Sequence, residues 1–309
     1  DTALADADTS TDGSTDVRVD GSGDATSPGC GETKASRDLQ YRTVSGVDSN
    51  LVSLDVYGPQ KPRGCKPAPV VLWVHGGAWA LGDKSNKVEE KVRLFREAGW
   101  VFVSTNYRLS PKRVARRAPG RIKHPTHVKD VAAAFGWVES NIAEYGGDPD
   151  RIALMGHSAG AHLVALASTD GRYLEDAGAD LGQVSCTISL DTAGYDIVEN
   201  LSGVAESSRK YKFYANAFGT DRQTWREASP ITHVDAQSSV PDFLLAKRGG
   251  PTRGNILEAF AAKVRASPAS VTVIDASGLT HKQVNVQVGA ADDETMTEPV
   301  MRFLRGCFE

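Results

Sequence analysis

The sequence predicts an α/β fold built on an open, mostly parallel sheet, and three observations carry this prediction. From residue 70 onward, short runs rich in β-branched residues alternate with stretches of helical periodicity. Several of these runs are apolar almost throughout, as parallel strands covered on both faces are. Before residue 60, two runs flank a turn at 46–50 and predict an antiparallel hairpin. Together they indicate a sheet with an antiparallel N-terminal hairpin and helices on both faces.

The elements follow in chain order. The hairpin is expected at 39–44 and 51–57. The parallel strands are predicted at 69–75, 101–107, 151–156, 186–190, 242–247 and 271–275. The clearest helix spans 125–145, where apolar residues recur at helical spacing. Further helices are predicted at 255–266 and 298–304.

Composition divides the 309 residues into an acidic tail and one domain. Residues 1–29 contain seven Asp and one Arg, a net charge of −6, whereas the whole chain carries −4. This Ser-, Thr- and Gly-rich segment has little to bury, so we predict that 1–29 is disordered. Residues 30–309 are then expected to form one catalytic domain. The small net charge predicts no general affinity for nucleic acid, and no apolar run approaches the roughly 20 residues of a membrane span.

The cysteines and the first residue suggest export. The chain begins at Asp1 and not at Met, so we expect that a signal segment was removed. Cys186 begins a predicted strand and Cys307 ends the last predicted helix, which favours a Cys186–Cys307 disulfide. Cys30 and Cys65 precede the hairpin and the next strand, which favours a second bridge, Cys30–Cys65. Two disulfides would place the protein outside the cytoplasm, secreted or periplasmic.

The segment 156–160, Gly-His-Ser-Ala-Gly, follows a predicted strand and opens a predicted helix. This is the pattern of a nucleophile elbow, in which a sharp turn exposes a serine hydroxyl. Ser158 is therefore the candidate nucleophile. The N–H of Ala159 is expected at the positive end of the helix that follows.

The segment 75–79, His-Gly-Gly-Ala-Trp, follows the strand at 69–75. Glycines at a strand end allow backbone N–H groups to point into a cavity. We expect the N–H groups of Gly76 and Gly77, with that of Ala159, to bind an oxyanion. Trp79 is predicted to form a wall of the substrate pocket, with packing in the core as the alternative.

With these motifs, and with Asn-Tyr-Arg-Leu at 106–109 and Gly-Gly-Asp-Pro at 146–149, the chain resembles the HGG-type esterase branch of the α/β-hydrolase family. That branch includes hormone-sensitive-lipase-like esterases, feruloyl-esterase-like enzymes and arylformamidases. The resemblance covers about residues 38–306. It implies the α/β-hydrolase fold and a general base after the last strand, where His281 lies. The other histidines have other interpretations: His75, His124, His127, His157, His162 and His233.

The catalytic acid departs from the family pattern. The family places it after the seventh strand, but residues 247–254 contain no Asp or Glu, and Thr252 or a neighbour occupies the expected place. Three carboxylates are possible substitutes. Asp191 follows the sixth strand and ranks first, Asp275 ends the last strand, and Asp242 begins the seventh at the far end. The alternative for Asp191 is that it only caps a turn.

A basic segment, 108–129, contains no acidic residue and is expected to rim the site. It can attract an acidic substrate, although we favour a solvated loop. Its basic residues are Arg108, Lys112, Arg113, Arg116, Arg117, Arg121, Lys123 and Lys129.

These features predict a secreted serine carboxylesterase that forms an acyl-enzyme on Ser158, with a small-molecule or polymer-linked ester as substrate. No metal or organic cofactor is predicted, because no Cys/His cluster has metal-ligand spacing. One alternative is an arylformamidase-type amidase using the same residues. A second is a catalytically weak binding module on a hydrolase scaffold. Neither the fold nor the motifs choose among cell-wall acyl groups, polyesters and small xenobiotic esters.

Overall fold

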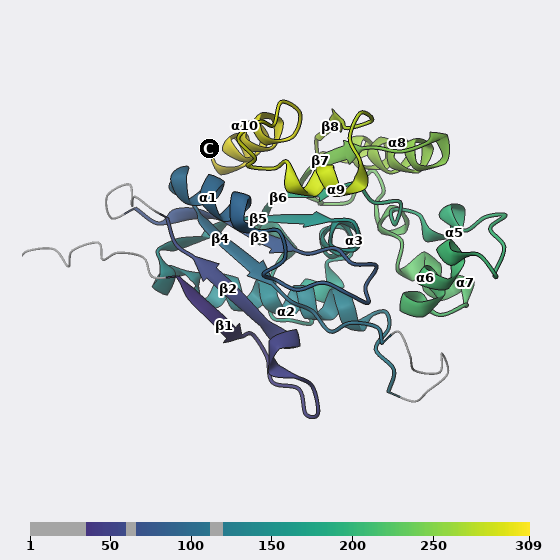
Figure 1. The fold of residues 1–309 in the computed structure, drawn as a ribbon, viewed down its shortest axis with the longest axis horizontal. Helices are drawn as coiled ribbons and strands as arrows, with labels where there is room; N and C mark the ends of the chain where they lie inside the picture. Colours follow the sequence, from purple (N-terminus) through teal and green to yellow (C-terminus); the bar gives the residue numbers. More distant parts are fainter. Residues whose placement is uncertain (1–34, 60–65, 112–119) are drawn as a thin grey trace, which may run out of the picture.

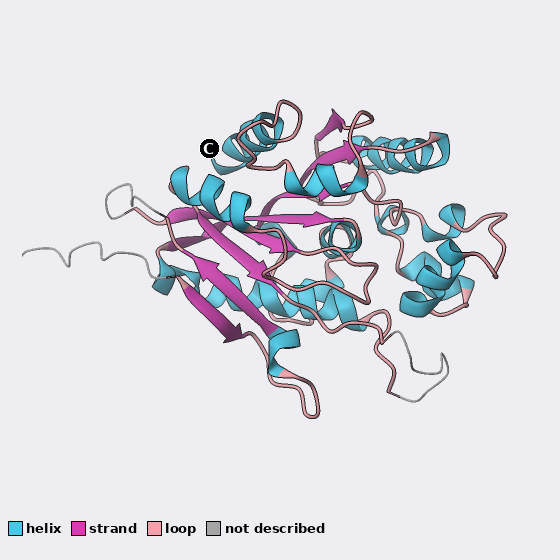
Figure 2. Ribbon diagram, viewed as in Figure 1, coloured by secondary structure: helices cyan, strands magenta, loops and turns pink. Residues whose placement is uncertain are grey.

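The computed structural model describes residues 35–59, 66–111 and 120–309, and they form one eight-stranded sheet (Figures 1 and 2). The strand order is β1-β2-β4-β3-β5-β6-β7-β8, with β1–β2 and β2–β4 antiparallel and the remaining pairs parallel. The strands are β1 (Ser36–Gln40), β2 (Ser53–Tyr57), β3 (Ala68–Val74), β4 (Val101–Thr105), β5 (Gly147–His157), β6 (Val184–Leu190), β7 (Asp242–Lys247) and β8 (Val271–Asp275). The predicted fold class, a mostly parallel sheet with an antiparallel N-terminal pair, is confirmed.

Helices cover both faces of the sheet. In Figure 1, α1 and α10 lie above the sheet and α2 lies below it. The helices are α1 (Glu89–Glu97), α2 (Thr126–Asn141), α3 (Ala159–Ala167), α4 (Arg172–Glu175), α5 (Ile197–Asn200), α6 (Arg209–Phe218), α7 (Arg222–Glu227), α8 (Pro251–Ala266), α9 (His281–Val286) and α10 (Thr297–Phe308). No helix in these described ranges has both the length and the apolar character that crossing a bilayer requires.

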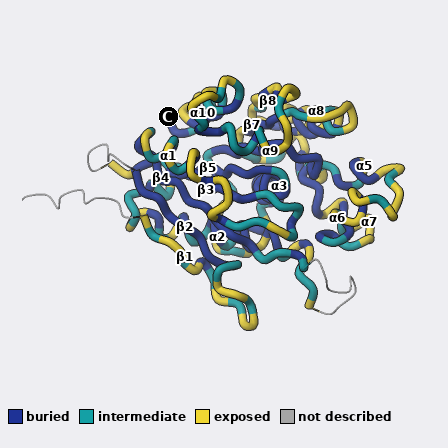
Figure 3. The backbone as a smooth tube through the Cα atoms, in the orientation of Figure 1, coloured by how far each residue is buried: buried dark blue, intermediate teal, exposed yellow. Residues whose placement is uncertain are grey.

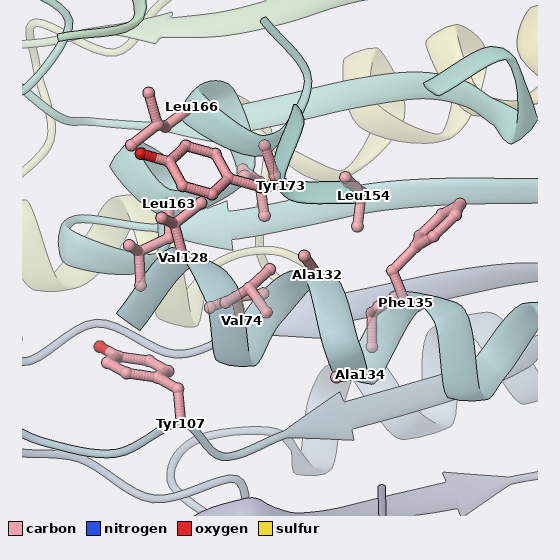
Figure 4. Packing of buried hydrophobic residues seen from close by; sticks show 14 of the residues in the cluster. Val74, Tyr107, Val128, Ala132, Ala134, Phe135, Leu154, Leu163, Leu166 and Tyr173 are labelled. Carbon is pink, nitrogen blue, oxygen red and sulfur yellow. The ribbon is translucent and has the colours of Figure 1, made fainter. Parts of the chain in front are cut away.

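Strand β3 shows why the central strands are apolar throughout. Val70, Leu72 and Val74 pack into the cluster that includes α2 and α3, whereas Val71 and Trp73 pack into the cluster that includes α1 and α10. Successive side chains of a strand point to opposite faces, so a strand covered on both sides must be apolar at every position. Figure 3 shows the buried centre of the sheet, and Figure 4 shows side chains of α2 directed toward those of β3 and β5.

Several element boundaries differ from the predictions. The first strand is Ser36–Gln40 and not 39–44. Tyr41, which follows it, still donates from its backbone N–H to the carbonyl oxygen of Val52 at 3.1 Å, and its hydroxyl donates to the carbonyl oxygen of Asn106, also at 3.1 Å. The helix predicted at 125–145 ends at Asn141 and continues as a 3₁₀ turn to Tyr145. The last helix is longer than expected and reaches Phe308.

The segment between β6 and β7, residues 191–241, was not predicted to contain helices. It carries α5, α6 and α7, which form a separate group of short helices at the right of Figure 1. Helix α6 is amphipathic, and it buries Tyr211, Ala215 and Phe218 in the same cluster as α2 and α3. This packing brings α6 close to the carboxyl end of β5, where the motif containing Ser158 lies.

One predicted disulfide is present. The sulfur atoms of Cys186, in β6, and Cys307, in α10, are 2.14 Å apart. Cys30, Cys65 and the predicted acidic tail 1–29 lie outside the described residues.

Candidate active site

Ser158 lies in a sharp turn between β5, which ends at His157, and α3, which begins at Ala159. Its backbone angles are φ 56° and ψ −112°, a strained conformation for a residue with a side chain. The turn requires a glycine at 160, because a Cβ there would lie 2.0 Å from the carbonyl oxygen of Val74. The strained turn and the close contact together direct the Ser158 hydroxyl into a pocket at the carboxyl end of the sheet.

His281 is placed by the start of α9. Thr280 caps this helix through a capping box with Gln283, which fixes the first turn, where His281 is the first residue. Nε2 of His281 lies 2.9 Å from Oγ of Ser158, and Nδ1 lies 2.5 Å from Oδ2 of Asp191. A neutral imidazole that donates from Nδ1 to the carboxylate accepts the serine proton at Nε2. The three side chains therefore form one continuous hydrogen-bonded chain.

Asp191 directly follows β6 and is 1% exposed, with φ 54°. Besides His281, it accepts from Nε of Arg248 at Oδ2 and from Nη2 of Arg253 at Oδ1. Burial alone would raise the pKa of Asp191, but the hydrogen bond from His281, the charge of Arg253 and the hydrogen bond from Arg248 hold it well below its usual range. Asp191 is therefore an ionised carboxylate beside the imidazole.

The other two candidate acids do not reach His281. Asp275 lies at the exposed end of β8 and accepts from the backbone N–H of Ser277 at 2.9 Å. Asp242 lies at the opposite end of the sheet and accepts from the N–H of Ser270 at 2.7 Å. Thr252, which occupies the family's place for the acid, lies in the first turn of α8. The structure thus brings only Asp191 of the three carboxylates to the histidine.

The loop after β3 lies directly against Ser158. A Cβ built on Gly76 would be 3.1 Å from Cβ of Ser158, so a larger residue would collide with the nucleophile. In the part of the chain that the structure describes, no hydrogen bond occupies the backbone N–H of Gly76, Gly77 or Ala159. These groups are available to a substrate oxygen. Ala78, which the sequence did not single out, lines the pocket next to them.

Trp79 lies between the pocket and the core. It lines the pocket, yet it is 4% exposed and packs in the core, with its ring centroid 4.7 Å from that of Phe218. Its Nε1 donates to Nδ1 of His162 at 3.2 Å, and Nε2 of His162 donates to the carbonyl oxygen of Ala228 at 2.7 Å. Burial lowers the pKa of His162 to about 4, which keeps this ring neutral. The two rings connect the loop after β3 to the helices beyond β6.

His157 supports the backbone of His281. Its Nε2 donates to the carbonyl oxygen of His281 at 2.9 Å, and the two ring centroids are 4.5 Å apart. Burial, and then the nearby His281, lower the pKa of His157 to about 3. A neutral ring at this place holds His281 without competing with it for a proton.

The pocket in front of Ser158 has a volume of about 130 Å³. Two aromatic side chains of α6, Phe213 and Tyr214, form one wall, which the sequence did not predict because the helix itself was not expected. Arg253 and Thr192 complete the polar part. The lining residues are Ala78, Trp79, Ser158, Ala159, Asp191, Thr192, Ala193, Phe213, Tyr214, Arg253 and His281.

The predicted basic segment is partly neutralised. Arg108 donates from Nε and Nη2 to the buried carboxylate of Asp130, each at 2.7 Å, and Lys129 pairs with Asp176 at 3.0 Å. Lys112, Arg113, Arg116 and Arg117 lie outside the described residues. Among residues 35–59, 66–111 and 120–309, no group of three or more His, Cys, Asp and Glu side chains is arranged to hold a metal ion.

The chain is similar to known esterases in sequence and in fold. Residues 54–248 match the model of the BD-FAE family. Esterase LipQ of Mycobacterium tuberculosis is 34% identical over 185 residues, which are 58% of this chain and 41% of LipQ. The chain therefore spans less than half of that relative's length. Esterase B from Lactobacillus rhamnosis superimposes with a TM-score of 0.68 at 19% identity, covering 89% of this chain and 87% of that chain.

A second solved structure is similar over most of its length. The thermostable carboxylesterase EstE1, cloned from a metagenomic library, has a TM-score of 0.66 at 25% identity, with 91% of this chain and 90% of that chain covered. These superpositions confirm the predicted α/β-hydrolase fold.

Proposed function

The chain belongs to the BD-FAE family, and we propose that it hydrolyses carboxylic esters with Ser158 as the nucleophile. One observation carries the proposal: the hydrogen-bonded chain from Ser158 through His281 to Asp191 opens into a pocket. This constellation is the arrangement that activates a serine hydroxyl in acyl transfer. The esterases among the similar proteins support the same reaction.

In the proposed mechanism, His281 takes the proton of Ser158 as Oγ attacks the acyl carbon. The oxygen of the tetrahedral intermediate is bound by the N–H groups of Gly76, Gly77 and Ala159, which no partner occupies within the described ranges. The imidazolium is stabilised by Asp191 and then protonates the departing alcohol. Water, deprotonated by His281, attacks the acyl-enzyme and releases the carboxylic acid.

We also propose that the protein acts outside the cytoplasm, secreted or periplasmic. The Cys186–Cys307 pair at bonding distance supports this location, since structural disulfides persist in oxidising compartments. Fractionation of the producing cells tests it. Recovery of the protein only in the cytoplasmic fraction would contradict this location.

Turnover of 4-nitrophenyl butyrate tests the proposed reaction. Wild-type protein should release 4-nitrophenol, and Ser158→Ala should lower kcat/KM by at least about 10³-fold. The matched control is Ser277→Ala, an exposed serine near the same end of the sheet, which should leave turnover unchanged. Faster hydrolysis of a formanilide than of the ester would favour an amidase. Equal activity of Ser158→Ala and wild type would contradict the proposal.

A further inference from the structure

The carboxylate of Asp191 accepts hydrogen bonds from more cationic side chains than a catalytic acid requires. Arg248 and Arg253 both donate to it, in addition to His281. One carboxylate neutralises one guanidinium, so a net charge of +1 remains beside the pocket while the imidazole is neutral. Asp191 is also the one acidic residue among those that line the pocket. The site therefore has a net positive charge close to the nucleophile.

The two arginines differ in where they lie. Arg253 lines the pocket together with Ser158, whereas Arg248 does not. The guanidinium of Arg253 donates from Nη2 to Asp191 and, at 3.4 Å, from Nε to the carbonyl oxygen of Arg248. A guanidinium has five N–H donors, and the remaining three have no partner in the part of the chain that the structure describes. Arg253 is 31% exposed, so these donors can reach a ligand.

A second cation reinforces the field. Lys210, at the start of α6, has its pKa lowered by partial burial and then by repulsion from Arg253. The charge of Lys210 therefore adds to the positive potential around Arg253. An anion bound at Arg253 would offset this repulsion.

We propose that Arg253 is a carboxylate-binding residue, and that the preferred substrates are esters with a free carboxylate on the group that occupies the pocket. A planar guanidinium with unpaired donors matches a carboxylate, and charge-assisted hydrogen bonds of this kind are stronger than neutral ones. The inference rests on the proposed esterase function and adds its substrate class.

Matched ester pairs test the proposal. One pair carries the charge on the acyl side: 4-nitrophenyl hydrogen glutarate and 4-nitrophenyl pentanoate. The other carries it on the alcohol side: 4-carboxyphenyl butyrate and its methyl ester. For at least one pair, wild-type kcat/KM should favour the carboxylate by about tenfold after subtraction of spontaneous hydrolysis. Differences in intrinsic reactivity cancel when this ratio is compared between variants.

Arg253→Gln and Arg248→Gln form a matched set, because each removes one arginine from Asp191 but only Arg253 lines the pocket. The ratio should fall to about one in Arg253→Gln and should survive in Arg248→Gln. Arg253→Lys, which keeps the charge, should retain part of it. Thermal unfolding of each variant verifies that it is folded.

Three results would overturn the proposal. In the first, the wild-type enzyme hydrolyses the neutral esters but shows no preference for the carboxylate in either pair. This result would leave the proposed esterase function intact. Another is an equal loss of preference in Arg248→Gln, which would assign the effect to Asp191. The third is no turnover of any ester, which would refute the esterase function as well.

Discussion

Nδ1 of His281 lies 2.5 Å from Oδ2 of Asp191, although the two residues come from loops that follow β8 and β6, with β7 between these strands. The loop after β7 reaches the same carboxylate from the other side and supplies Arg248 and Arg253 in place of an acid. Asp191 thus lies one strand away from the family's place for the acid, and Arg248 and Arg253, from the loop at that place, donate hydrogen bonds to it. This relationship leads to the first prediction.

Replacement of Asp191 by Asn should lower kcat/KM for 4-nitrophenyl butyrate by about 100-fold or more. An amide can occupy the space, but it does not stabilise the imidazolium and permits the wrong tautomer of His281. Steady-state kinetics measure the loss, and circular dichroism verifies the fold. The matched control is Asp275→Asn, which should stay within about twofold of wild type. A large loss in the control and none in Asp191→Asn would reverse the assignment.

Replacement of Gly160 by Ala should destabilise the protein by about 2–4 kcal/mol. The new Cβ would lie 2.0 Å from the carbonyl oxygen of Val74, so α3 would have to move away from β3. Gly306→Ala is the control: it is also helical, a Cβ there meets open space, and helix propensity predicts a small gain. Urea denaturation compares the two. Equal free energies of unfolding would show that the contact is not tight.

Acidification should destabilise the fold between about pH 6.5 and pH 4. Burial lowers the pKa of His124, His127 and His157 to about 3 and that of His162 to about 4. In this range the unfolded chain binds protons that the folded chain excludes, so the free energy of unfolding falls as pH falls. Each histidine contributes up to about 1.4 kcal/mol per pH unit.

The variant His162→Gln tests this linkage, because an amide can donate and accept as the ring does without titrating. Denaturation with urea at several pH values should give a slope that is smaller by up to about 1.4 kcal/mol per pH unit than in wild type. An unchanged pH dependence of the free energy of unfolding would mean that folding does not lower the pKa of His162.

Removal of the Cys186–Cys307 disulfide should lower the free energy of unfolding by about 2–5 kcal/mol without lowering kcat. The bridge closes a loop of 121 residues, and Cys186 lies near the amino end of β6, away from Ser158. The double variant Cys186→Ala/Cys307→Ala isolates this bridge from the other cysteines. Unchanged stability would show that the bridge is not formed, and a large loss of kcat would show that it supports the site.

Local patterns made much of the fold predictable. Fully apolar strands such as β3 need helices on both faces, and the segment 156–160 requires the sharp turn that holds Ser158. His281 followed from its position after the last strand. In each case the physical requirement lies within a few consecutive residues.

The supporting residues of the site could not be read from the sequence. Asp191 is 57 residues from Arg248 and 62 from Arg253, so nothing in their local segments indicates that they meet. The wall formed by Phe213 and Tyr214 depends on helix α6, which lies in a segment of short helices without a long periodic pattern. Such contacts depend on how separate loops pack at the end of the sheet.

Covalent labelling tests the central claim, that Ser158 is an activated nucleophile, most directly. The probe is diethyl 4-nitrophenyl phosphate, and peptide mass spectrometry locates the adduct. We expect complete inactivation with one diethylphosphoryl group per chain on Ser158, and no labelling of Ser158→Ala. Labelling of a different residue in step with inactivation, or full activity of a protein labelled at Ser158, would contradict the account.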